Sequence, residues 1–104
     1  MTKYALIYTG GGMPESEAEG AKVMEAWRNW MGSLGEALVD GGNPFSNAKS
    51  IVSDGSVSDA TIGVRASGYS LLNADSLDAA VTMAKGCPHL QNGGQISVYE
   101  TMEM

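Results

Sequence analysis

The stretch from Gly68 to Leu90, GYSLLNADSLDAAVTMAKGCPHL, constrains the fold more than any other part of this chain. Its first residues are β-prone, and a turn follows at which Asp75 or Ser76 can cap a helix. The apolar residues of that helix are spaced to share one face, at Leu77, Ala80, Val81 and Ala84. Gly86 predicts a left-handed helix end, and Pro88 prevents the helix from continuing. The stretch therefore predicts a buried strand, a short helix and a Cys-Pro-His loop.

A first strand and a longer helix are predicted before this unit. Residues 4–9 are apolar on both alternating faces, which is typical of a central strand. The glycine triplet at 10–12 is expected to form a turn, because it lacks the spacing of a phosphate-binding loop. Ser16 and Glu19 then form a capping-box pattern ahead of a helix that is expected to end near Gly35.

The middle and the end of the chain predict shorter strands. A strand begins at Ala37, and Asp54-Gly55 lies between β-prone residues, a pattern that favours a hairpin with a primed turn. Residues 65–72 and 95–101 are the next two strands. The order of strand, helix, short strand and hairpin, strand, helix, strand predicts one α+β domain over residues 1–104.

The predicted sheet has a second face with nothing to cover it. If both helices lie on one face, the alternation in residues 4–9 and 95–101 leaves apolar side chains on the other. A domain of 104 residues gains stability by burying such a face. We therefore expect a homodimer joined through it, with a buried area of roughly 1,600 Å².

Composition excludes several partners. The net charge is −6 and the isoelectric point about 4.5. Six scattered Lys and Arg residues cannot form the basic surface that nucleic acids or anionic membranes require. No apolar run reaches membrane-spanning length, and the apolar N-terminal stretch is too short for a secretion signal. With one cysteine and no disulfide, the chain is expected to be cytoplasmic, without nucleic-acid or membrane partners.

Several short motifs carry a resemblance to a known family. They are Lys3-Tyr4 in the first strand, Gly68-Tyr69 opening a strand, Asp75 to Ala80 opening a helix, Cys87-Pro88-His89 after it, and Gly93-Gly94 before the last strand. In these places the chain resembles the YCII-related family. The resemblance implies a ferredoxin-like domain, with a mostly antiparallel sheet and two helices on one face, that pairs into a dimeric α/β barrel.

The chain departs from that family at two motifs. The branch it resembles most usually carries Asp-Gly-Pro-Phe before the Gly-Tyr strand, and here residues 57–62 read VSDATI, so that only Asp59 remains. Another branch has a proposed catalytic pair, a histidine in the first helix and an aspartate before the proline. Those positions hold Trp30 and Cys87 here, so the chemistry of that pair is not implied for this chain.

His89 is the candidate catalytic residue, because imidazole exchanges protons near neutral pH. Asp59 or Asp75 is the expected partner that orients its ring. The alternative is a structural role, in which His89 caps the second helix or hydrogen-bonds a loop. The candidate binding residues are Tyr69, Trp27, Trp30 and Asn29, although the apolar stripe of the first helix favours a core role for both tryptophans.

The side chains that could bind a metal or act as a nucleophile indicate neither a metal site nor a cofactor. Cys87 follows a helix C-terminus, where the dipole disfavours a thiolate, so it is a poor nucleophile. One histidine and one cysteine two residues apart do not make a zinc site.

Two classes of function remain open. The first is a small metal-independent enzyme that acts on an organic acid, lactone or aromatic compound, which is the chemistry that the resemblance implies. The second is a non-catalytic ligand-binding or interaction module with an accessory or regulatory role.

Overall fold

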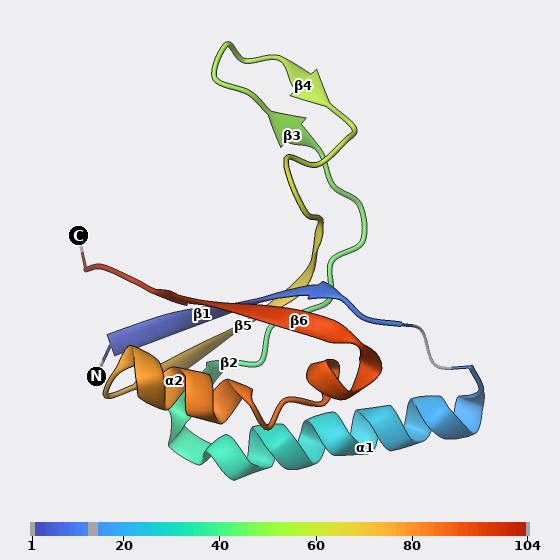
Figure 1. The fold of residues 1–104 in the computed structure, drawn as a ribbon, viewed down its shortest axis with the longest axis vertical. Coiled ribbons are helices and arrows are strands. Elements are labelled where there is room, and N and C mark those ends of the chain that lie inside the picture. Colours follow the sequence, from blue (N-terminus) through green and yellow to red (C-terminus); the bar gives the residue numbers. More distant parts are fainter. Residues whose placement is uncertain (1, 13–14, 104) are drawn as a thin grey trace.

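A computed structural model describes residues 2–12 and 15–103 of the chain. Its main sheet has four antiparallel strands in the order β2-β5-β1-β6, and both helices cover the same face (Figure 1). The predicted α+β, ferredoxin-like class is therefore confirmed.

The two longest strands lie side by side in the middle of the sheet. They are β1 (Thr2–Gly10) and β5 (Ala66–Ala74), and β1 also pairs with β6 (Gly94–Glu100) along its other side. The prediction that the first strand is central is confirmed. The fourth strand, β2 (Leu38–Asp40), follows a 3-10 turn, η1 (Gly35–Ala37), and forms the opposite edge.

The first helix, α1 (Glu17–Leu34), begins and ends as its sequence predicts. The Ser16 hydroxyl oxygen accepts the Glu19 amide at 3.2 Å, and the Glu19 carboxylate accepts the amide of Glu15, also at 3.2 Å. Gly35 terminates the helix with a positive φ of 55°. A residue with a Cβ would be strained in that conformation.

The second helix, α2 (Leu77–Ala84), ends differently from the prediction. Of the two expected caps, Ser76 is the one that accepts an amide, that of Ala79 at 3.1 Å. Gly86 does not adopt the predicted left-handed conformation. Its absent side chain leaves room for Trp30 instead, because a Cβ there would make a tight contact of 3.2 Å with the Trp30 ring. Pro88 then opens a second 3-10 turn, η2 (Pro88–Asn92), which carries His89.

The predicted hairpin forms as a separate two-stranded sheet, β3 (Ser50–Ile51) with β4 (Val57–Ser58). Its turn is not the primed type that Asp-Gly favours, because only Gly55 has a positive φ, and Gly55 donates its amide to the carbonyl of Val52. We call residues 43–65 the arm. The arm stands away from the sheet on the side opposite the helices (Figure 1).

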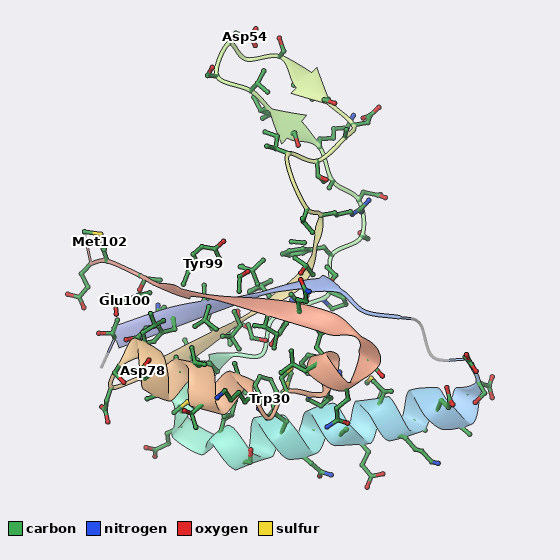
Figure 2. The ribbon with its side chains drawn as sticks, in the orientation of Figure 1. Trp30, Asp54, Asp78, Tyr99, Glu100 and Met102 are labelled. Carbon is green, nitrogen blue, oxygen red and sulfur yellow. The ribbon has the colours of Figure 1, made fainter. Side chains whose placement is uncertain are left out.

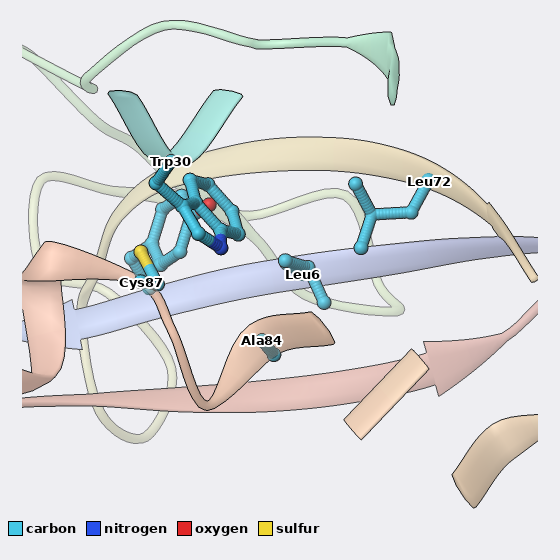
Figure 3. Close-up of a cluster of buried hydrophobic side chains, with 6 residues drawn as sticks. Leu6, Trp30, Leu72, Ala84 and Cys87 are labelled. Atoms are coloured by element: carbon cyan, nitrogen blue, oxygen red, sulfur yellow. The ribbon is translucent and has the colours of Figure 1, made fainter. Parts of the chain in front are cut away.

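The core fills the space between the sheet and the two helices. The inward residues of β1 are Tyr4, Leu6 and Tyr8, which alternate with half-buried residues on the open face. The main cluster joins the sheet to both helices (Figure 3) and consists of Leu6, Tyr8, Trp30, Leu72, Ala84 and Cys87. In residues 2–12 and 15–103, no helix is long and apolar enough to cross a membrane.

Candidate functional site

His89 lies at the end of the sheet where β1 finishes. Its Nε2 atom is 2.8 Å from the carbonyl oxygen of Thr9. Because a carbonyl oxygen can only accept, Nε2 must carry the hydrogen of this bond. The neutral ring then has its free lone pair on Nδ1. The bond therefore fixes both the tautomer and the orientation of the ring, as the partner of a catalytic histidine does.

Two glycines allow the His89 ring to occupy this place. A Cβ on Gly94 would overlap the ring, so the His89 ring can lie here only because β6 begins with a glycine. A Cβ on Gly11 would lie 3.3 Å from Nδ1, and Gly11 has a positive φ of 87°. The missing side chain at Gly11 thus leaves the Nδ1 side of the ring less crowded.

An aromatic row extends from His89 into the core. The Tyr8 ring is centred 5.2 Å from the His89 ring, Trp27 lies 5.5 Å from Tyr8, and Trp30 lies 5.7 Å from Trp27. The Tyr8 hydroxyl donates to Ser70 Oγ at 2.7 Å, and Ser70 donates to the Gly41 carbonyl at 2.7 Å. Burial raises the pKa of Tyr8 far above its ordinary value, so its hydroxyl stays protonated and its ring lines the site.

Cys87 is buried in the core beneath this row (Figure 3). Burial raises the pKa of its thiol, although the His89 amide and the Tyr8 hydroxyl favour the thiolate. The expectation of a poor nucleophile fits this environment.

Neither aspartate expected to orient His89 is close to it. Asp59 lies in the arm with 89% of its side chain exposed, and it pairs with Lys49 at 2.9 Å. Asp75 follows Ala74, which pairs with Thr2 at the opposite end of β1 from Thr9. The prediction that Asp59 or Asp75 orients the His89 ring is therefore wrong. The carbonyl of Thr9, rather than a carboxylate, accepts the hydrogen bond from the ring.

The four predicted binding residues are also dispersed. Trp30 is buried, with 7% of its surface exposed, and its Nε1–H donates to the Met83 carbonyl at 3.0 Å, which fits a structural role. Asn29 is exposed on α1. Tyr69 lies on the open face of the sheet, where Phe45 stacks on it at 5.7 Å. Of the four, Trp27 comes nearest to His89 along the aromatic row, because it is half-buried against Tyr8, which packs on the His89 ring.

An apolar groove lies between α2, β6 and η2, the 3-10 turn that carries His89. We call it the α2–β6 groove. Its volume is about 280 Å³. This is near the lower end of the range for small-molecule sites. Its lining is aliphatic except for Lys85, and comprises Leu77, Val81, Ala84, Lys85, Leu90, Ile96 and Val98. Within the described part of the chain, no three His, Cys, Asp or Glu side chains are placed to hold a metal ion.

Comparisons with known proteins show the fold but not the family. No protein-family model matches the sequence, and no curated protein matches it significantly. A solved structure of similar fold is 5-chloro-2-hydroxyhydroquinone dehydrochlorinase (TftG) from Burkholderia phenoliruptrix, in complex with 2,5-dihydroxybenzoquinone. The TM-score is 0.56 and the identity 16%, over 97% of this chain and 95% of that chain. At this identity the likeness extends to the fold alone.

Proposed function

We propose that this chain is a small metal-independent enzyme in which His89 is the general acid and base. The observation that carries the proposal is the hydrogen bond from His89 Nε2 to the Thr9 carbonyl, which leaves Nδ1 as the free proton acceptor. When Nδ1 accepts a proton, the hydrogen bond from Nε2 to the Thr9 carbonyl holds the ring in place. Tyr8 and Trp27 supply the apolar surface beside the reacting group.

The substrate class we propose is a small organic acid, lactone or hydroxylated aromatic compound. The lone pair of Nδ1 suits proton abstraction from an acidic O–H or C–H group of such a molecule. The proposal gains support from the similar fold of a dehydrochlorinase bound to a dihydroxybenzoquinone. We further propose that the enzyme is a cytoplasmic homodimer of the YCII-like kind, paired through the open face of the sheet into a dimeric α/β barrel.

Two substitutions of His89 separate catalysis from structure. His89→Gln can still donate an amide hydrogen to the Thr9 carbonyl but has no basic atom, so it should keep the parent melting temperature and lose turnover. His89→Ala loses the hydrogen bond as well and should cost about 0.5–2 kcal/mol of stability. Turnover is measured by mass spectrometry on a panel of lactones, hydroxylated benzoic acids and 2,5-dihydroxybenzoquinone. Undiminished turnover by His89→Gln would overturn the proposal.

The α2–β6 groove favours a second candidate, a non-catalytic ligand-binding or interaction module. The groove is aliphatic with a single lysine at its rim, which suits an apolar anion. Under this alternative, benzoate-type ligands bind the groove without conversion, Lys85→Met weakens their binding, and His89→Gln leaves it unchanged. Chemical-shift mapping of both variants with benzoate distinguishes the two functions.

A further inference from the structure

The arm receives little support from its own chain. Within residues 43–65, every residue except Ser50 and Thr61 is exposed, and each strand of the hairpin has two residues. Such a hairpin is marginally stable by itself in water. The arm nevertheless exposes five aliphatic side chains, at Ile51, Val52, Val57, Ile62 and Val64. The radius of gyration is 15.1 Å, against about 13 Å for a compact domain of this length. The arm therefore needs an apolar surface outside its own chain.

The direction of the arm and the distribution of charge favour a second copy as the source of that surface. The arm leaves the sheet at Phe45, whose ring stacks on Tyr69 of the open face. Figure 2 shows Tyr99 on the same side of the sheet as the arm, with Trp30 on the other. By strand alternation, the described residues of β1, β5 and β6 place one charged side chain on this face, Lys3.

Five of the twelve acidic residues lie along α1 and its flanks, at Glu15, Glu17, Glu19, Glu25 and Glu36, and Asp40 at the β2 edge accepts the hydroxyl of Tyr69. Two chains of net charge −6 can therefore meet through their open faces with little repulsion. A second chain docked on that face lies directly beside the arm.

Symmetry limits where the arm of one copy meets the other. Two orientations of the two-fold axis between facing sheets are compared, one along the strands and one across them. An axis along the strands places β2 of one copy over the β6 edge of the other, at the same end of the sheet. The arm base, where Pro44 bridges to Gly68, lies at the end where β6 begins at Gly94. That arrangement brings the arm to the α2–β6 groove, in which Leu77 and Leu90 are exposed.

We propose that the arm of one copy packs across the β6 edge of a second copy and covers its α2–β6 groove. The inference rests on the homodimer of the proposed function and adds the contact that each chain makes beyond the sheet. It explains an apolar arm and an apolar groove by a single reciprocal contact. It also places the arm beside the partner's catalytic site, because the His89 ring packs on Gly94 at the start of β6. Each site is then completed by the second chain.

Cysteine crosslinking tests the contact without disturbing the core. Ile62, Leu90 and Val39 are 71%, 40% and 42% exposed, so each tolerates substitution, and the native Cys87 is buried. The double variant Ile62→Cys/Leu90→Cys is treated with a bismaleimide crosslinker, and we expect a covalent dimer on a denaturing gel. The parent chain and both single variants should remain monomeric on the same gel. The double variant Ile62→Cys/Val39→Cys tests the axis across the strands, which would bring the arm to the β2 edge.

The outcomes separate this inference from the dimer on which it rests. Crosslinking through Leu90, at least tenfold more efficient than through Val39, supports the contact. Preferential crosslinking through Val39 overturns it, and so does a dimer in light scattering that crosslinks through neither position. A monomer in light scattering overturns the homodimer itself, and the arm contact with it.

Discussion

The position of the His89 ring depends on two glycines, Gly94 and Gly11, whose missing side chains leave room for it. Gly94→Ala would place a Cβ inside the ring, so it should move His89 off the Thr9 carbonyl and lower stability by about 1–3 kcal/mol. Gly32→Ala is the matched control, because Gly32 lies within α1 with no atom near its absent Cβ. The control should gain up to about 1 kcal/mol. Urea unfolding compares the two, and equal stabilities would contradict the packing described for His89.

The buried thiol of Cys87 predicts how stability responds to alkali. Burial raises its pKa in the folded protein above the ordinary value of 9.0. The native state therefore keeps a proton that the unfolded chain releases, so this contribution is full below pH 9 and is lost as pH rises further. The free energy of unfolding of the parent should fall as pH rises above about 9, and should fall less steeply in Cys87→Ala. Identical slopes in both proteins would contradict it.

At the scale of secondary structure, local signals predicted the elements well. Ser16 with Glu19, and Ser76 before α2, are short-range patterns that need no tertiary contact, and both caps form. Gly86 was predicted as a left-handed terminator, but its role depends on Trp30, which is 56 residues away in sequence. The sequence shows that a position is glycine, but it does not show whether the reason is a positive φ or the space that a neighbouring side chain takes.

The candidate site was harder to predict because its geometry is made by the backbone. Sequence singled out His89, but the group that orients it is the carbonyl of Thr9, which any residue could supply. Asp59 was a candidate to orient His89 because it is a carboxylate, but it lies in the arm, which stands away from the sheet. The Gly93-Gly94 pair drew notice in the sequence only as a family motif before the last strand, although Gly94 also makes room for the imidazole.

Docking of α1 onto the core depends mainly on one of its two tryptophans. Trp30 is buried and hydrogen-bonded to Met83, so Trp30→Ala should cost about 3–5 kcal/mol. Trp27 is half-buried, and Trp27→Ala should cost less, about 1–3 kcal/mol, while exposing the Tyr8 ring. Thermal unfolding followed by circular dichroism measures both. A larger loss for Trp27 than for Trp30 would reverse this assignment.

For the whole molecule, the open face of the sheet should hold two copies together. Ile7, Leu71 and Tyr99 lie on this face, and among residues 2–12 and 15–103 no helix covers it (Figure 1). An introduced charge there would be buried without a partner in a dimer but hydrated in a monomer. Ile7→Glu should therefore shift the molar mass in light scattering from about twice the 10.8 kDa of the chain to the mass of a single chain, while leaving its circular dichroism spectrum unchanged.

The control for that shift is Met24→Glu, which adds the same charge at an exposed position of α1, on the opposite side of the molecule. It should stay dimeric at the same micromolar concentration. Dimers of both variants would show that the open face is not the interface, and monomers of both would attribute dissociation to net charge rather than to the face. Monomeric Ile7→Glu beside dimeric Met24→Glu is the one result that the arrangement predicts, because only the first charge lies where the two sheets meet.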